Sequence, residues 1–318
     1  MDCYHIAFCV NDTYARYITV TIKSIAENCK SPNGGGVYIH VITDGISEIN
    51  LQYLEQVVSE YKNILLKIYV VDDSSLQNLK ITHSWPIQAW YRILLPDILP
   101  AEVSRVLYLD ADTLVVSNIK ELFAINMVDR SIAATLDVQS VFDEPYIRCC
   151  YESVKQYICS GVLLMNLEYW RANRLTETII KWAQHNSDRL KCPDQDAINY
   201  VCRTSKIVLP LRYGILQWFF TNENFYQEPY IEQLRDCVTN PAIIHYASSV
   251  PWYYDTPKHI MYKQWFRYNK MLKSPIKCTY RTNGFVLIKM ICWNLLHPFS
   301  KKSKQLNLKG VKSRLFNV

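Results

Sequence analysis

The chain has 318 residues, 49% of them hydrophobic, and a net charge of +6, which suits one large domain or a domain with an appendage. It does not open with a basic segment followed by a long apolar core, and no uninterrupted apolar run reaches 18 residues. We therefore expect neither a conventionally secreted nor a membrane-spanning protein. Eleven cysteines without a Cys-x-x-Cys pair fit reduced thiols in a cytosolic protein better than a disulfide framework or a zinc site.

The charge is divided unevenly along the chain. After Asp255 there is no Asp or Glu, but fourteen Lys and Arg residues remain, so residues 1–255 contain 21 basic and 29 acidic residues. The pattern predicts an acidic body, residues 1–255, and a basic C-terminal extension, residues 256–318. The acidic body argues against nucleic acid as a partner.

One segment of this extension, residues 284–299, is apolar and aromatic and has basic residues on both sides. It is too short to span a bilayer, and its flanking Arg281, Lys301, Lys302 and Lys304 favour a helix lying on an anionic membrane surface. The alternative is an ordinary packed helix followed by a solvated, lysine-rich end.

Apolar periodicity predicts the elements of the body. We predict a strand at 6–10, a helix over 14–29, a strand at 37–42, a helix capped by Ser47 and a strand at 64–71. A helix near 87–95, a strand ending at Leu109, an apolar segment at 132–136, a buried strand over 158–167 and a helix over 176–186 follow. Alternating strands and helices predict an α/β fold whose mainly parallel sheet is covered by helices on both faces, as in nucleotide-binding domains.

Two carboxylates, Asp110 and Asp112, follow the buried strand that ends at Leu109. Residues two apart in an extended chain point the same way, and ligands of α/β proteins bind at the carboxyl ends of strands. Converging carboxylates repel each other unless a cation lies between them, and all-oxygen ligands favour Mg²⁺ or Mn²⁺ over zinc. Asp194 and Asp196 have the same spacing, so the spacing alone does not identify a metal site. The predicted strand before Asp110 is what favours Asp110 and Asp112 as the ligands.

Four motifs, in this order and spacing, resemble those of glycosyltransferase family 8. They are Tyr108–Val115, Ser160–Arg171, Pro193–Asn199 and His245–Trp252. The resemblance covers roughly residues 4–270 and is strongest to bacterial galactosyl- and glucosyltransferases of lipopolysaccharide or lipooligosaccharide synthesis. It implies a single GT-A-type, Rossmann-like domain with a mixed, mainly parallel sheet. This domain would transfer galactose or glucose, with retention, from UDP-galactose or UDP-glucose to an oligosaccharide or lipid-linked glycan. Together with the basic extension, this places the protein in the cytoplasm, on the inner face of the plasma membrane.

The resemblance also implies roles for individual residues. Asp110, Asp112 and His245 would bind Mn²⁺, with Mg²⁺ as the alternative ion. Asp194 and Gln195 would stabilise positive charge in a front-face reaction, although a nucleophile on the opposite face is the other route to retention. The residues implied to contact the donor, with Tyr14 stacked on its base, are Cys9, Val10, Asn11, Asp12, Thr13, Tyr14, Arg92, Asp110, Ala111, Asp137, Cys159, Ser160, Gly161, Asp194, Gln195, Ser248, Ser249 and Lys258.

The chain departs from the family pattern at two places. Cys159 stands where relatives carry an asparagine, and the segment after His245 lacks their glycine and lysine, which leaves Ser248, Ser249 and Lys258 as its phosphate-binding groups. A non-catalytic UDP-sugar- or glycan-binding protein is therefore one alternative, and a metal-dependent phosphoesterase or nucleotidyltransferase is another.

Each candidate residue also has a purely structural interpretation. His245 could be a hydrogen-bonded core histidine, and Gly161 a close-packing position in a buried strand. Asp194 and Asp196 could be helix-capping or solvated carboxylates.

Overall fold

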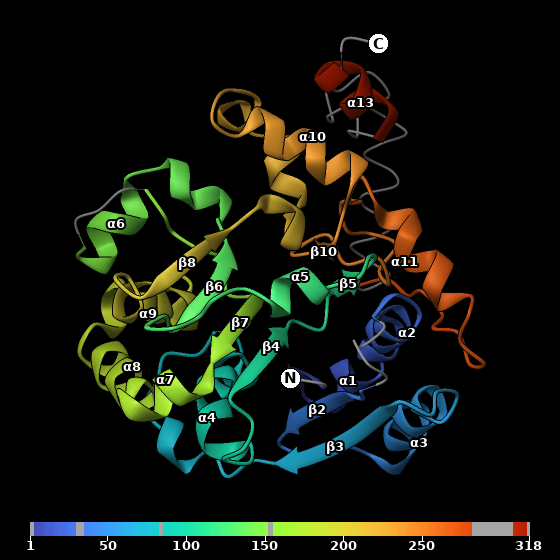
Figure 1. Ribbon diagram of the computed structural model, residues 1–318, viewed down its shortest axis with the longest axis horizontal. Coiled ribbons are helices and arrows are strands. Elements are labelled where there is room, and N and C mark those ends of the chain that lie inside the picture. Colours follow the sequence, from blue (N-terminus) through green and yellow to red (C-terminus); the bar gives the residue numbers. More distant parts are fainter. Residues whose placement is uncertain (1–2, 30–34, 83–84, 152–154, 282–307, 317–318) are drawn as a thin grey trace.

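The computed structural model describes residues 3–29, 35–82, 85–151, 155–281 and 308–316. Its main sheet has seven strands in the order β3-β2-β1-β4-β7-β6-β8 (Figure 1). These strands are β1 (Tyr4–Cys9), β2 (Val37–Thr43), β3 (Ile64–Val70), β4 (Arg105–Leu109), β6 (Ile132–Thr135), β7 (Val162–Asn166) and β8 (Lys206–Leu209). Neighbouring strands are parallel except at β7, which runs antiparallel to both β4 and β6. The predicted mixed, mainly parallel sheet is confirmed.

A smaller sheet continues from the end of β4. It contains β5 (Thr113–Val115), β10 (Ile243–His245) and β9 (Ile215–Leu216), with β10 in the centre. Strand β10 runs antiparallel to β5, which places His245 opposite Thr113. The turn that joins β4 to β5 therefore lies beside the end of β10, at the junction of the two sheets.

Helices cover both faces of the main sheet, as predicted. Alternate residues of β1 enter different cores: Ile6 and Phe8 pack with α2 and α3, whereas Ala7 packs with the segment around Trp90 and the helices α7 to α9. The α-helices are α1 (Asp12–Ala15), α2 (Ile18–Asn28), α3 (Glu48–Val58), α4 (Leu95–Ile98), α5 (Lys120–Phe123), α6 (Glu144–Cys149), α7 (Leu167–Ala172), α8 (Leu175–His185), α9 (Pro193–Val201), α10 (Ile231–Thr239), α11 (Tyr262–Asn269) and α13 (Leu308–Phe316).

Two predicted helices begin differently from the prediction. The helix predicted over 14–29 is divided into α1 and α2, because the Asn11 side chain accepts a hydrogen bond from the Tyr14 amide and starts a separate short helix. Ser47 occupies the N-cap position of α3, but its hydroxyl makes no capping bond and donates instead to Asp12 Oδ1.

Two further elements were predicted incorrectly in detail. Residues Ile87–Leu94 form a 3₁₀ helix, η3, before the short α4. Pro96 has no amide N–H to donate back to Arg92, so a regular α-helix cannot run through this point. The strand predicted over 158–167 begins only at Val162, because the Ser160 amide bonds to the side chain of Gln195 rather than to a neighbouring strand.

The described parts of the C-terminal extension pack on the body. Helix α11 lies beside α2, and α13 lies against α10 (Figure 1). Trp265 in α11 and Val311 and Leu315 in α13 are buried in the larger core. The apolar segment 284–299 lies outside the described residues. Within the described part of the chain, no helix is long and apolar enough to cross a bilayer.

Candidate active site

Asp110, Asp112 and His245 converge where the two sheets meet. Each offers one ligand atom, and these atoms lie within 4.8 Å of one another. Nε2 of His245 is 3.2 Å from Asp112 Oδ1 and 3.7 Å from Asp110 Oδ2. The two carboxylates are partly exposed, whereas the imidazole is buried. Among the described residues this cluster is the one group of three or more such side chains arranged to hold a metal ion.

Two backbone features hold this cluster in place. The Asp110 amide donates to the Gly161 carbonyl, and the Tyr246 amide donates to the Asp112 carbonyl, which ties the turn to β7 and β10. Gly161 leaves space for the ligands: a Cβ there would lie 2.2 Å from His245 Cε1 and 2.6 Å from Asp110 Oδ2. Gly161 is a close-packing position, and the side chains packed against it are those of the metal-ligand candidates His245 and Asp110.

The electrostatics of the cluster call for a cation. Burial disfavours the charged form of His245, but the charge of Asp112 leads the interactions that outweigh burial and raise the pKa of His245 well above its usual range. A protonated imidazole would balance the carboxylates when no ion is bound. Two carboxylates and one imidazole are a suitable ligand set for Mn²⁺, so the residues present fit the ion implied by the sequence.

Arg92, at the end of η3, links three predicted donor-site residues. Its guanidinium donates to Asp110 Oδ1 at 3.0 Å and to the Ser160 carbonyl at 2.6 Å, and it lies 3.3 Å from Asp194 Oδ2. Burial opposes its charge, but Asp110 leads the interactions that outweigh burial and raise the pKa of Arg92. The ring of Tyr108 lies 4.4 Å from the guanidinium carbon, and its hydroxyl donates to Asp110.

Asp194 and Gln195 lie in the first turn of α9, close to the same site. Gln195 Oε1 accepts a 2.9 Å hydrogen bond from the Ser160 amide, and its Nε2 lies 3.3 Å from Asp137 Oδ2. Asp194 Oδ2 accepts from the Ser160 hydroxyl, whereas its buried Oδ1 has no hydrogen-bond partner among the described residues. Burial raises the pKa of both Asp137 and Asp194. The arrangement presents two buried carboxyls and a fixed amide.

The end of β1 and the start of α1 form another side of the site. Val10 is buried, Thr13 and Tyr14 are exposed, and Asn11 caps α1. The Asp12 carboxylate accepts hydrogen bonds from Ser47 and Asn50, so it also anchors this turn to α3. Tyr14 lies edge-on to Trp252 with ring centroids 6.2 Å apart. Burial raises the pKa of Tyr14, and the nearby charge of Asp112 raises it further.

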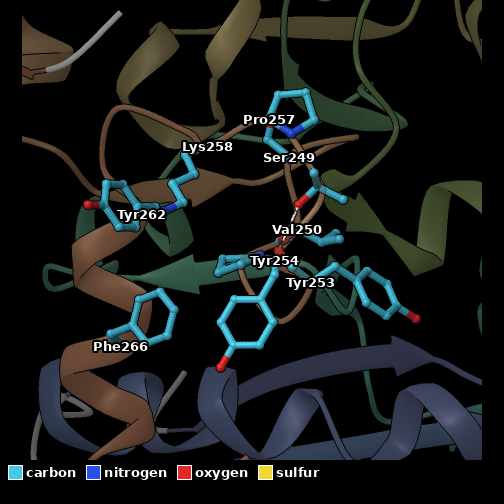
Figure 2. Close-up of a pocket in the computed structure, with 10 residues that line it drawn as sticks. Ser249, Val250, Tyr253, Tyr254, Pro257, Lys258, Tyr262 and Phe266 are labelled. Atoms are coloured by element: carbon cyan, nitrogen blue, oxygen red, sulfur yellow. Dashed lines mark hydrogen bonds between the residues drawn. The ribbon is translucent and has the colours of Figure 1, made fainter. Parts of the chain in front are cut away.

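The segment after His245 curves around a pocket of about 110 Å³ (Figure 2). Ser249 is buried, and its hydroxyl has no hydrogen-bond partner in the described part of the chain. Ser248 adopts a positive φ of 59°. Lys258 extends toward the ring of Tyr262, with Nζ 5.1 Å from the ring centroid (Figure 2). The structure therefore brings Ser249 and Lys258 to one pocket.

Cys159 lies beneath the site and is only 6% exposed. Its sulfur lies 3.6 Å from Nδ1 of His245, the ring nitrogen that faces away from the two aspartates. Burial raises the pKa of this thiol. The side chain thus contacts a metal-ligand candidate, while Ala111 lies at the partly exposed rim between the two aspartates.

An ion pair that the sequence did not indicate supports the whole α9 turn. Asp196 is completely buried and accepts hydrogen bonds from Arg148 and Tyr157. It also accepts from the amides of Lys191 and Cys192, the residues just before α9. Asp196 lies within the helix, whose N-cap is Cys192, so both the capping and the solvated interpretation of Asp196 are wrong. No sequence signal connects Arg148 with Asp196, since they are 48 residues apart. Tyr108 could have been found, because it lies two residues before Asp110 in an extended segment.

The fold and the site define a class of protein. A mixed sheet of this topology with a carboxylate pair at the end of a central strand is the GT-A type of glycosyltransferase fold. The galactosyltransferase LgtC, solved in complex with donor and acceptor sugar analogues, superimposes with a TM-score of 0.73 at 23% identity, covering 85% of this chain and 96% of that chain.

The sequence comparisons identify the family. The family model of Glycosyl transferase family 8 matches residues 5–256, and the chain belongs to this family. It is 28% identical over 257 residues to a lipopolysaccharide 1,2-glucosyltransferase of Escherichia coli, covering 79% of this chain and 74% of the relative. It is 24% identical over 264 residues to a lipopolysaccharide 1,3-galactosyltransferase of Salmonella typhimurium, with the same two coverages. The chain is therefore a hexosyltransferase related to the glucosyl- and galactosyltransferases of lipopolysaccharide synthesis.

Proposed function

We propose that the protein transfers galactose or glucose, with retention, from a UDP-sugar to a lipopolysaccharide-type or other surface glycan. The reaction depends on Mn²⁺, or alternatively Mg²⁺, held by Asp110, Asp112 and His245. The observation that carries the proposal is the convergence of these three side chains within 4.8 Å at the carboxyl end of β4. When bound, the ion would neutralise the diphosphate and stabilise the charge that develops on UDP as the leaving group.

The donor sugar binds between η3 and α9. Arg92 orients Asp110 and Asp194, because its buried guanidinium contacts both carboxylates. The unpartnered Oδ1 of Asp194 supplies an acceptor for a sugar hydroxyl. Asp137 supplies another, and the Asn11–Tyr14 turn and the Ser248–Lys258 segment bind the nucleoside and diphosphate respectively.

The geometry of Gln195 supports the front-face route. Its oxygen already accepts a hydrogen bond from the Ser160 amide and its nitrogen is directed to Asp137, so the amide is fixed at both ends. A fixed carbonyl dipole suits stabilisation of an oxocarbenium-like ion, whereas an amide oxygen is a poor nucleophile. Asp194 adds negative charge beside it.

Substitution of a metal ligand tests this function. Asp112→Asn keeps the shape of the side chain but removes its charge, and we expect loss of Mn²⁺-dependent UDP release and Mn²⁺ binding weakened by more than about 100-fold. Asp129→Asn makes the same charge change at an exposed position and serves as the matched control. Circular dichroism and the melting temperature of both variants check that the fold is intact. Wild-type release by Asp112→Asn would refute the metal assignment.

The acceptor and location form a separate part of the proposal. A lipid-linked acceptor at the inner face of a bacterial plasma membrane accounts for both the acidic catalytic body and the basic extension. Replacing Lys301, Lys302 and Lys304 by Gln should weaken binding to anionic vesicles by about 100-fold, at about 1 kcal/mol for each lysine. UDP release from soluble UDP-sugar should not change.

A matched control makes the same charge change on the body. Its three positions, all exposed, are Lys62, Lys120 and Lys181. Co-sedimentation with vesicles that contain phosphatidylglycerol measures both triple variants. Equal effects of the two would assign membrane binding to overall charge rather than to the extension.

A further inference from the structure

His245 is held from both sides of its ring. Nε2 faces the carboxylates of Asp112 and Asp110 at 3.2 and 3.7 Å, and Nδ1 faces the sulfur of Cys159 at 3.6 Å. His245 and Cys159 are both buried, at 4% and 6% exposure. The thiol is therefore placed on the side of the imidazole opposite the proposed metal ion.

We propose that Cys159 is a positioning residue for the metal site, whose sulfur accepts the Nδ1–H of His245 and so directs the Nε2 lone pair toward the ion. The inference rests on the proposed metal dependence and names a residue that sets how well the site binds its ion. It differs from the donor-sugar contact that the family resemblance implies for this position.

The two nitrogens of a neutral imidazole have different roles. One carries a proton and donates, and the other accepts. Because a metal ion must bind the nitrogen that lacks the proton, Nδ1 has to carry it when Nε2 is the ligand. A buried N–H needs an acceptor, and among the described residues the hydrogen-bond partner of Nδ1 is the Cys159 sulfur.

The backbone around Cys159 holds the thiol in this position. The Cys159 amide donates to the Thr135 carbonyl at 2.9 Å, and the next amide, of Ser160, donates to Gln195 Oε1 at 2.9 Å. One residue further, the missing side chain of Gly161 leaves room for the imidazole ring itself. Three consecutive residues thus contact the site through different groups, and the first of them is fixed against Nδ1.

The chemistry of the acceptor has a consequence for affinity. Outer partners of metal-bound histidines are usually carboxylates or carbonyls, and their removal typically weakens metal binding by about 10- to 100-fold. A thiol sulfur is a weaker acceptor than either group. The Cys159 sulfur therefore raises the basicity of Nε2 less than a carboxylate would. Its main contribution is to fix the orientation of the imidazole ring.

Mn²⁺ binding in the absence of any donor tests the inference. Electron paramagnetic resonance titration gives the dissociation constant directly, and we expect Cys159→Ala to raise it by about 10- to 100-fold. Cys159→Ser keeps a hydrogen-bonding atom at the end of the side chain and should lie between Cys159→Ala and the wild type. Cys237→Ala is the matched control, since it removes another fully buried thiol in α10 and should bind Mn²⁺ as the wild type does.

A second measurement reports the tautomer. The ¹⁵N chemical shifts of His245 in the Mg²⁺-loaded protein should show a proton on Nδ1 in the wild type and a mixture of tautomers in Cys159→Ala. Equal Mn²⁺ affinity of Cys159→Ala and the wild type would overturn the role of Cys159 but not the proposed function. So would a serine variant that binds more weakly than the alanine variant. A wild-type protein that binds no Mn²⁺ would overturn the proposed function as well.

Discussion

Gly161 lies against the imidazole of His245 with no space for a side chain between them, since a Cβ would come within 2.2 Å of Cε1. The same Cβ would lie 2.6 Å from Asp110 Oδ2. Gly161 immediately precedes β7, the antiparallel strand of the main sheet. The chain therefore passes the metal-ligand cluster at a residue that has no side chain. The position of two of the three proposed ligands therefore depends on the absence of a side chain.

Gly161→Ala should displace His245 or Asp110. A displacement of about 1 Å in a catalytic group can cost about 100-fold in rate, and we expect a loss of that order in Mn²⁺-dependent UDP release. Gly36→Ala adds the same methyl group where the nearest atom would be 3.5 Å away, and it should retain activity. Activity of Gly161→Ala within twofold of the wild type would show that the ligands tolerate the displacement.

Much of the fold could be predicted from the sequence. The strands at 37–42 and 64–71 were placed within about one residue because each is a short run of mostly apolar residues between polar turns. The direction of β7 could not be predicted. A strand that is buried on both faces is apolar throughout, so its side-chain pattern is the same whichever way it runs. The segment around Arg92 was placed correctly, but its 3₁₀ geometry was not predicted, because the apolar pattern does not reveal how Pro96 interrupts a regular α-helix.

The candidate site was predictable to a different extent. The sequence alone predicted that Asp110 and Asp112 converge, on the assumption of an extended segment. They do converge, but in the turn between β4 and β5, where the Thr113 amide donates to the Asp110 carbonyl. Bringing His245 to the same point required the family resemblance, since it lies on a strand far along the chain. The contact between Cys159 and His245 and the ion pair of Arg148 with Asp196 could not be predicted, because each joins elements whose relative positions only the folded chain determines.

Lys258 is predicted to contribute to diphosphate binding. Lys258→Ala should weaken UDP binding by about fivefold, or about 1 kcal/mol for an exposed charged contact, and should leave uridine binding unchanged because uridine has no phosphate. Lys263→Ala removes a lysine five residues further on and is the control. Isothermal titration with UDP and uridine measures both. Equal losses for the two ligands, or no loss for UDP, would remove Lys258 from the donor site.

His259 should make the protein less stable in weak acid. Its Nδ1 accepts from the Met261 amide and its Nε2 donates to the Ile215 carbonyl, so the folded protein requires the neutral ring. Burial lowers the pKa of His259 from 6.5 to about 3. As the pH falls, the His259 ring is therefore protonated in the unfolded chain before it is protonated in the folded protein. The contribution of His259 to the free energy of unfolding is complete above pH 6.5 and is lost progressively as the pH falls toward 3. Between pH 7 and 5 the expected loss is about 2 kcal/mol.

Urea denaturation at the two pH values measures this loss. His259→Gln should be less stable at pH 7, because it loses at least one of the two hydrogen bonds, but its stability should decrease less between pH 7 and 5. His185→Gln, at an exposed position, should show the wild-type dependence on pH. The same pH dependence in His259→Gln as in the wild type would exclude His259 as the origin of the acid sensitivity.

Metal-dependent hexosyl transfer is measured as UDP release by the wild-type protein from UDP-galactose, UDP-glucose, UDP-N-acetylglucosamine and UDP-glucuronic acid, each with an oligosaccharide acceptor. Each reaction is run with Mn²⁺ and again with EDTA. We expect release from UDP-galactose or UDP-glucose with Mn²⁺ and none with EDTA. Equal release in EDTA, or release only from the other two donors, would contradict a Mn²⁺-dependent hexosyltransferase built on Asp110, Asp112 and His245.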